Sequence, residues 1–360
     1  MKIDRVDKNL LVKTEIEEEN IVFYDVKSEP FKIYGLYNPQ KEDVFKRMPS
    51  DVAKETSEGV FILHTNTAGG RVRFKTDSEY VAISVKVRDI HLMSHMALAG
   101  ISGFDMYVKD ENGYRCEKTF FPCPNGVTSP LETEKRGGYE GVHHFGERKM
   151  RDITLNFPLY NDVQGLYVGV QKDAQILEGD NYKYDKPIVC YGSSITQGGC
   201  ASRPGNAYSN ILSRMLDADV YNLGFSGSAL AEDKIVDYIA GLDMKVFIYD
   251  YDHNAPDLEH LKNTHEKMFK KIRKQNPDMP VIIISRPQYH YTEEREKRRE
   301  IIKTTYQNAL KAGDKNVYFI NGSEFFRECG DSATVDNCHP NDLGFMCMAK
   351  RIYETLEDIV

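Results

Sequence analysis

Residues 188–199 read IVCYGSSITQGG, an apolar run that ends on a Gly-Ser-Ser corner. A short apolar run followed by glycine is typical of a buried strand that ends in a tight turn. Such a turn between a strand and a helix exposes the serine hydroxyl and directs the free amide groups of the helix toward a developing oxyanion. The stretch therefore predicts an α/β unit with a reactive serine at the end of a strand.

A second stretch, Asp336-Asn337-Cys338-His339-Pro340, supplies the groups that such a serine needs. A serine hydroxyl is a poor nucleophile at neutral pH, so an imidazole must take its proton and a carboxylate usually fixes the imidazole tautomer. We predict Ser194 as the nucleophile, His339 as the general base and Asp336 as the orienting carboxylate. Taken alone, the corner would indicate only a turn or a helix cap. The Asp-x-x-His-Pro stretch favours acyl transfer.

Composition narrows the class of protein. The chain has 360 residues, of which 41% are hydrophobic and 28% charged, values typical of a folded globular protein of about two domains. The net charge of −8, without a long Lys/Arg block beside aromatic residues, argues against nucleic acid as a partner. The N-terminus lacks the apolar core of a signal peptide, and no window reaches a membrane-spanning length. We therefore expect a cytoplasmic protein without a membrane partner.

The cysteines and histidines do not form a recognisable metal pattern. Seven cysteines are scattered without a C-x-x-C pair, which favours reduced thiols over a disulfide framework or a zinc ribbon. His91 and His95 stand four residues apart, but the sequence places no third ligand beside them. We expect a metal-independent protein without a cofactor.

Strand-like alternation dominates the first half of the chain. Val81, Ile83, Val85 and Val87 occupy every second position of one run, as in a half-buried strand. Similar runs, separated by turn residues, lie at 59–64, 70–75, 103–108, 152–157 and 165–171. Residues 133–151 show no clear period and are predicted to form a loop. The pattern predicts a jelly-roll-like β-sandwich over residues 1–180.

Apolar strands alternate with amphipathic helices in the second half, the pattern of a parallel sheet covered on both faces. We predict strands at 187–191, 219–222, 245–249, 281–285 and 317–320. We predict helices at 207–216, 233–241, 258–276, 292–312 and 342–356. Residues 181–360 should thus form a three-layer α/β/α domain with a five-stranded parallel sheet, joined to the sandwich at the polar stretch 178–181.

Two further residues follow strand ends and offer hydrogen-bond donors for an oxyanion. Gly227 follows the second predicted strand and lets the backbone approach a ligand with its N–H, and Asn254 follows the third and offers a side-chain amide. Each alone is more typical of a turn. With the amide of Ser194 they are the candidate oxyanion hole, because ligands of open parallel sheets bind at the carboxyl ends of the strands.

The second half resembles the SGNH hydrolases, also called GDSL-type esterases, over roughly residues 186–360. The family is defined by serine, glycine, asparagine and histidine in that order, matched by Ser194, Gly227, Asn254 and His339. The resemblance implies a serine hydrolase with the triad given above. The sequence departs from the family at Ser193, where aspartate is usual, and at Asp252-His253, where a Gly-x pair commonly precedes the asparagine. We expect Ser193 to cap and support the turn as aspartate would.

The first half is similar to an accessory domain marked by a Gly-x-Asp-Leu-Tyr pattern, matched by Gly103-Phe104-Asp105-Met106-Tyr107. The similarity implies a β-sandwich, and the pair of domains resembles SGNH esterases that deacylate carbohydrates. We expect Asp105 and Tyr107 to fix a strand and a turn.

The predicted activity is removal of acetyl or another short acyl group from a small-molecule or oligosaccharide ester, through an acyl-enzyme on Ser194. Arg203 is a candidate substrate-binding residue, and Arg286 is a similar candidate. Three alternatives stay open: a carbohydrate-binding or inactive SGNH-like protein, an acyltransferase, or a lipid esterase that uses the same residues. The sequence leaves the oligomeric state open.

Overall fold

The structure, a computed structural model, describes residues 14–18, 20–123, 129–357 and 359. The chain forms two compact units. Unit 1 comprises residues 1–46, 65–181 and 203–205, and unit 2 comprises residues 47–64, 182–202 and 206–360. The main transition falls between Asn181 and Tyr182, next to the predicted boundary. Two short segments depart from a single boundary: residues 47–64 belong to unit 2, and residues 203–205 belong to unit 1.

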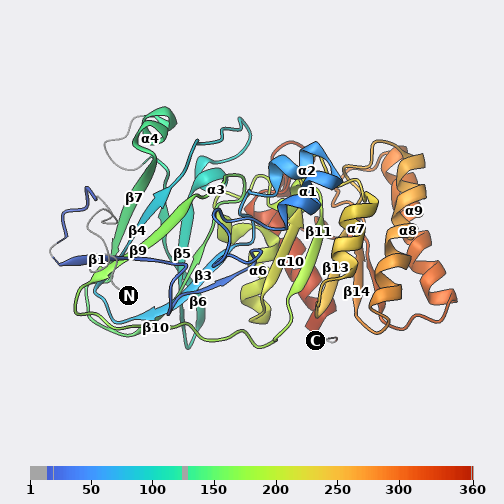
Figure 1. The fold of residues 1–360 in the computed structure, drawn as a ribbon. Helices are drawn as coiled ribbons and strands as arrows, with labels where there is room; N and C mark the ends of the chain where they lie inside the picture. Colours follow the sequence, from blue (N-terminus) through green and yellow to red (C-terminus); the bar gives the residue numbers. More distant parts are fainter. Residues whose placement is uncertain (1–13, 19, 124–128, 358, 360) are drawn as a thin grey trace. The chain divides into compact units, whose positions relative to one another are not determined.

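Unit 1 contains two antiparallel sheets (Figure 1). The first has the spatial order β1 (Ile21–Asp25), β9 (Gly165–Gln171), β4 (Tyr80–Lys86) and β7 (Gly138–His144). The second has the order β10 (Ile176–Glu178), β3 (Arg71–Thr76), β8 (Arg151–Asn156), β5 (Phe104–Asp110) and β6 (Gly113–Phe120), with β2 (Lys32–Tyr34) also paired to β3. Two short helices, α3 (Leu98–Ser102) and α4 (Pro130–Arg136), complete the unit.

One apolar core joins the two sheets of unit 1. Val81, Ile83 and Val85 of β4 are buried in it, as their alternation predicts. They pack in the same cluster as Phe74 of β3 and Ile153 of β8, which belong to the second sheet. The unit is therefore the predicted β-sandwich, with inward-facing side chains of both sheets forming its core.

Two predictions for the first half are wrong. The run 59–64, predicted as a strand, lies mostly in helix α2 (Glu58–Leu63), which Ser57 caps by accepting a hydrogen bond from the Val60 N–H. A short apolar run fits either element, and the cap favours the helix. The stretch 133–151, predicted as a loop, contains the end of α4 and all of β7. β7 pairs with β4 over its full length, a long-range contact that its polar sequence does not reveal.

Unit 2 is built on a five-stranded parallel sheet. Its spatial order is β12 (Val220–Gly224), β11 (Ile188–Gly192), β13 (Val246–Asp250), β14 (Val281–Ile284) and β15 (Val317–Ile320). Gly192 is in register with Gly224 and Asp250 at the carboxyl ends of the three neighbouring strands. All five predicted strands are confirmed to within two residues at each end.

Helices cover both faces of this sheet (Figure 1). The helices of unit 2 are α1 (Ser50–Thr56), α2, α5 (Ser194–Gln197), α6 (Tyr208–Leu216), α7 (Asp233–Ala240), α8 (Leu258–Gln275), α9 (Glu293–Lys311) and α10 (Asp342–Glu357). Apolar residues of α7, α8 and α9 share one core cluster with Val189 and Phe247 of the sheet. α6 and α10 lie on the other face, where Tyr208 and Phe345 pack ring to ring. The predicted three layers and the five predicted helices are confirmed.

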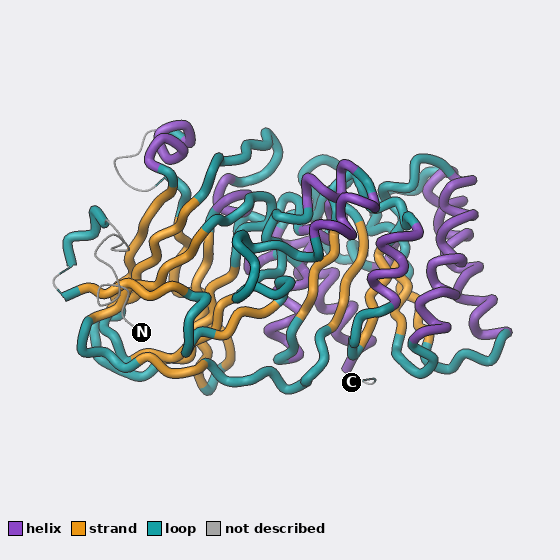
Figure 2. The backbone as a smooth tube through the Cα atoms, viewed as in Figure 1, coloured by secondary structure: helices purple, strands orange, loops and turns teal. Residues whose placement is uncertain are grey.

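Loops connect the strands and helices of both units, and Figure 2 distinguishes them by colour, with loops in teal, helices in purple and strands in orange. Short 3₁₀ helices occupy three of these loops: Pro204–Asn206, Gly322–Glu324 and Gly330–Ala333. Within the described residues, no helix combines the length and the apolarity that crossing a membrane requires.

Candidate active site

The serine corner is a tight junction between β11 and α5. Gly192 ends the strand, and a Cβ at this position would lie 2.2 Å from Thr196 Oγ1 and 2.3 Å from the Asp250 carbonyl oxygen. Only glycine allows this close approach of α5 to the strand ends. Ser193 caps α5, since its Oγ accepts a hydrogen bond of 3.2 Å from the Ile195 N–H. The predicted capping role of Ser193 is therefore confirmed.

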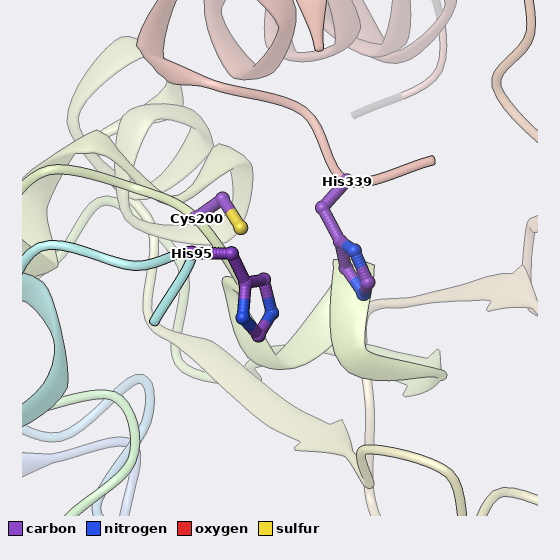
Figure 3. Close-up of side chains that lie close together, drawn as sticks. All are labelled: His95, Cys200 and His339. Carbon is purple, nitrogen blue, oxygen red and sulfur yellow. The ribbon is translucent and has the colours of Figure 1, made fainter. Parts of the chain in front are cut away.

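Ser194, His339 and Asp336 form a continuous hydrogen-bonded chain. Ser194 Oγ lies 3.0 Å from His339 Nε2, and His339 Nδ1 lies 2.8 Å from Asp336 Oδ2. His339 lies on the segment that leads into α10. Figure 3 shows its side chain together with that of Cys200, which follows α5. The third residue labelled in Figure 3, His95, belongs to unit 1. The structure thus brings Ser194 into contact with a pair, Asp336 and His339, that lies more than a hundred positions later in the sequence.

The Asp336 carboxylate holds both the ring and the backbone of His339. Its Oδ1 accepts hydrogen bonds from the backbone N–H groups of His339 (2.7 Å) and Cys338 (3.1 Å), while Oδ2 faces the ring. Partial desolvation opposes ionisation, but these hydrogen bonds lower the pKa of Asp336 below its usual value. The carboxylate is therefore ionised at neutral pH and orients the imidazole.

Cys338 lies beside two histidines of the site. Its Sγ is 3.7 Å from His253 Nδ1 and within 4.8 Å of a ring nitrogen of His339. Interaction with this sulfur, assisted by Asp336 and opposed by burial, raises the pKa of His339 to about 9. Although burial opposes it, the interaction with His339 and the charge of Arg286 lower the pKa of the Cys338 thiol. The sequence places Cys338 beside the base, but a single cysteine in a His-Pro motif does not reveal this influence.

The two further oxyanion candidates are neighbours. The Asn254 side chain is oriented so that Nδ2 donates to the Phe225 carbonyl oxygen and Oδ1 accepts from the Gly227 N–H, each at 3.2 Å. Gly227 has a φ of +66°, which favours glycine. In this arrangement the Gly227 N–H is used by Asn254, so both groups would have to turn toward a ligand to bind an oxyanion. Their role stays a prediction.

Arg47 supports the strand end that leads to Gly227. Its fully buried guanidinium donates from Nη1 to the carbonyl oxygens of Asn222 (3.1 Å) and Gly224 (2.5 Å) and from Nη2 to that of Leu63 (2.7 Å). It also lies over the Phe225 ring, 4.7 Å from the centroid. Sequence analysis missed Arg47, because the residue precedes the predicted hydrolase domain by more than a hundred positions.

Replacing Arg47 with methionine should lower the free energy of unfolding by about 3 kcal/mol, because buried carbonyl oxygens lose their donor. kcat/KM for an ester should also fall, since the β12 end leads to Gly227. Urea unfolding and ester kinetics on the folded variant measure the two effects. Arg327→Met, at an exposed position of the same unit, is the control and should change neither. Equal stability of Arg47→Met and the native protein would contradict this assignment.

The buried carboxylate of Asp250 holds α5 in place through a hydrogen bond from Thr196. Asp250 ends β13, and its Oδ2 accepts hydrogen bonds from Thr196 Oγ1 (2.8 Å) and the Tyr208 hydroxyl (3.4 Å). Desolvation raises the pKa of Asp250 to about 7, although the hydrogen bond from Thr196 opposes this shift. Thr196 lies two residues after Ser194, so Asp250 fixes the turn that carries the serine.

Arg203, the candidate substrate-binding residue, belongs to unit 1. Its Nη1 donates to Asp105 Oδ2 at 2.9 Å and to the Tyr107 hydroxyl, and the same carboxylate oxygen accepts from the Gly205 N–H at 2.7 Å. Asp105 is fully buried and also accepts from Asn156 Nδ2. Asp105 and Tyr107 thus fix the segment 203–205, a structural role of the kind expected for them, although the sequence did not indicate this segment as their partner. A substrate contact of Arg203 stays a prediction.

One side-chain cluster of unit 2 has the composition of a metal site. The potential ligand atoms of Asp336, Cys338 and His339 all lie within 4.8 Å of one another. Both ring nitrogens of His339 already face hydrogen-bond partners, however, so a metal ion would displace either Asp336 or Ser194. The donor set therefore fits a hydrogen-bonded catalytic chain better than a metal centre.

Comparisons with known protein families divide the chain as the fold does. Residues 185–357 match the model of the GDSL-like lipase/acylhydrolase family. Residues 21–176 match the model of the N-terminus of SGNH-hydrolase-type esterases. The comparison with curated proteins gives no match.

Three solved structures illustrate the likeness. One is a Bacteroides ovatus protein whose description as a GDSL-like lipase is itself an inference. Its sequence is 28% identical to this chain, and the two structures match with a TM-score of 0.83 over 94% of this chain and 98% of the other. The salicylyl-acyltransferase SsfX3 of a tetracycline biosynthetic pathway is 17% identical with a TM-score of 0.74, over 95% and 98%. A family two carbohydrate esterase from Clostridium thermocellum, in complex with cellohexaose, is 13% identical with a TM-score of 0.62, over 91% and 98%. At such low identity the last two show a shared fold.

Proposed function

Because residues 185–357 belong to the GDSL-like lipase/acylhydrolase family and residues 21–176 form the N-terminal domain of SGNH-type esterases, we propose that the protein is a serine esterase that removes acetyl or another short acyl group from a carbohydrate. The observation that carries the proposal is the hydrogen-bonded chain of Ser194, His339 and Asp336 beside the carboxyl ends of the parallel strands. This is the position in which open α/β sheets bind their ligands.

The proposed reaction has two steps. Neutral His339 takes the proton of Ser194 as Oγ attacks the ester carbonyl carbon, and the carbonyl oxygen becomes an oxyanion. The N–H of Ser194, with Gly227 and Asn254 once they turn toward it, would stabilise this charge. His339 then protonates the departing sugar oxygen, which leaves an acyl-enzyme. In the second step His339 takes a proton from water, hydroxide adds to the acyl carbon, and the acid leaves as Ser194 regains its proton.

A carbohydrate as the alcohol part of the ester is supported by the two-domain fold. Family two carbohydrate esterases share this architecture over nearly their whole length, and one of them is described in complex with cellohexaose. The salicylyl-acyltransferase shares it as well, so the fold alone does not select the acceptor of the acyl group. We therefore propose the carbohydrate substrate on the combined likeness and leave acyl transfer as an outcome of the test.

The test is acetate release from a panel of acetylated oligosaccharides, with triacylglycerol and a salicyl thioester as competing substrates. The proposal expects acetate release from the oligosaccharides and labelling of the protein by a serine-directed fluorophosphonate. Hydrolysis of the lipid alone, or acyl transfer that requires an acceptor other than water, would replace it with another activity of the same site. Binding of oligosaccharides without labelling or turnover would indicate an inactive, carbohydrate-binding relative.

The proposed mechanism also predicts an alkaline pH dependence. Only neutral His339 can act as base, and its pKa is raised to about 9, so kcat/KM should rise with pH through a midpoint near that value. Cys338→Ala removes the first cause of this shift and should move the midpoint of the profile to lower pH, whereas Cys116→Ala on β6 should leave it in place. Initial rates with a neutral ester from pH 6 to 10 measure both midpoints. A native profile already level at pH 7 would contradict the raised pKa.

A further inference from the structure

Arg286 follows β14 and extends the site along the sheet edge. Its backbone N–H donates to Asp252 Oδ2 at 2.9 Å, which ties it to the loop that carries His253 and Asn254. Asp252 is fully buried, so this loop contact is fixed within unit 2. Arg286 thus lies beside the loop of the proposed oxyanion residue.

The half-buried guanidinium of Arg286 has few hydrogen-bond acceptors for its donors. Nη2 donates to Cys338 Sγ at 3.5 Å, a weak acceptor, and the buried Nε has no hydrogen-bond partner. Among the described residues, no carboxylate lies within ion-pair distance of this guanidinium. By contrast, Arg273 in the same unit is paired with Asp314 at 2.7 Å. Leaving a buried donor unpaired costs free energy, which a ligand that accepts these hydrogen bonds would recover.

The surroundings of Arg286 carry excess positive charge. Burial, and then repulsion from Arg295 and Arg298, lower the pKa of Arg286, although Cys338 and Asp252 oppose the shift. Arg298 is paired with Glu294 at 3.2 Å and lies 3.8 Å from Asp252 Oδ1, whereas the Arg295 guanidinium donates to the neutral carbonyl oxygen of His290. An anion placed against Arg286 would therefore supply a stronger acceptor than the Cys338 sulfur and would reduce this repulsion.

Arg286 also lies close to the reacting groups. Cys338 Sγ, which it contacts, lies within 4.8 Å of the ligand atoms of Asp336 and His339. One side chain therefore separates the guanidinium from the base, a separation that a single sugar ring can bridge. The same loop exposes two aromatic rings, Tyr289 at 53% and Tyr291 at 71%, which offer stacking surfaces for the apolar face of a sugar.

We propose that Arg286 binds a carboxylate of the carbohydrate ester, so that the preferred substrates are O-acylated acidic sugars such as uronates. A guanidinium matches a carboxylate in shape and donates two parallel hydrogen bonds, which a neutral sugar cannot accept in the same way. This inference rests on the proposed esterase function and names its substrate class. It concerns recognition, and Arg286 takes no part in the chemical steps.

The test compares acetate release from two substrates that differ only in charge: an O-acetylated methyl galacturonoside and the O-acetylated methyl galactoside, which carries a hydroxymethyl group in place of the carboxylate. The ratio of kcat/KM for the acidic over the neutral sugar should exceed one in the native protein and fall roughly 10- to 100-fold in Arg286→Gln, the cost of a charge-assisted pair. The ratio removes any general effect of Arg286 on Cys338 and His339. Arg327→Gln, at an exposed position, should retain the native ratio.

The outcomes separate this inference from the esterase proposal. If the native protein hydrolyses both sugars with equal efficiency, or if Arg286→Gln keeps the native preference, the inference is wrong while the esterase proposal stands. If neither sugar nor any acetylated oligosaccharide is hydrolysed and no fluorophosphonate label appears, the esterase proposal itself fails. In that case, binding of the unacetylated galacturonoside by calorimetry still tests Arg286: loss of binding in Arg286→Gln supports it, and unchanged or absent binding overturns it.

Discussion

Ser194→Ala should lower kcat for ester hydrolysis roughly 10⁶-fold, the loss seen when a triad serine is removed from a serine hydrolase. The reason is that Ser194 Oγ is the atom that faces His339 Nε2, at 3.0 Å. Without it, His339 has no proton to accept and no covalent intermediate can form. The fold should persist, because alanine fits the position of serine in the first turn of α5 and leaves the Ser193 cap in place.

Ser193→Ala is the matched control, since the two serines are adjacent and only one faces the base. Ser193 caps α5, so its removal should cost about 1 kcal/mol of stability and retain most of the turnover. Steady-state rates and circular dichroism on both variants separate the two roles. Full turnover in Ser194→Ala, or loss of turnover confined to Ser193→Ala, would show that the assignment of Ser194 as the nucleophile is wrong.

Asp336→Asn should lower kcat roughly 10⁴-fold, as the equivalent change does in a serine protease. Asp336 Oδ1 accepts from two backbone N–H groups, so the oxygen of the new amide would remain there and its NH₂ group would face His339 Nδ1. Nδ1 must then accept a hydrogen bond, which puts the proton on Nε2, the nitrogen that faces Ser194. The imidazole is held in the tautomer that cannot act as a base.

Asp331→Asn tests whether this loss is specific. Asp331 is an exposed carboxylate of the same loop and pairs with His290 rather than with the catalytic chain. Its replacement should leave kcat within a factor of about two, in line with the small contribution of surface ion pairs. An equal loss of rate in both variants would show that any change in this loop impairs catalysis. It would contradict the claim that Asp336 acts by fixing the tautomer of His339.

Much of the fold could be predicted from sequence because the signals of the second half are local. The apolar runs at 188–192 and 281–284 are buried on both sides, as expected for strands covered by helices, and the structure places them where predicted. The first half was harder. β7 is held in its sheet by pairing with β4, and α2 depends on a cap at Ser57, so neither follows from the periodicity of its own residues.

The candidate site divides in the same way. Ser194, Asp336 and His339 stand in short motifs whose spacing has a chemical meaning, and the structure brings them into hydrogen-bond contact. Arg47 and Asp250 act through buried contacts with residues far away in sequence, and no motif marks them. Arg286 could be named from its place after a strand, but only the structure shows that its buried Nε lacks a hydrogen-bond partner.

The central claim is that Ser194 carries the acyl group between the two steps, and trapping this intermediate tests it most directly. The native protein would be mixed with 4-nitrophenyl acetate, quenched with acid within the first turnover, and measured by intact mass and peptide mapping, with Ser194→Ala in parallel. The account predicts a gain of one acetyl group in the native protein, located on Ser194, and no gain in the variant. Acetyl release without any trapped adduct, or an adduct on another residue such as Cys338, would contradict it.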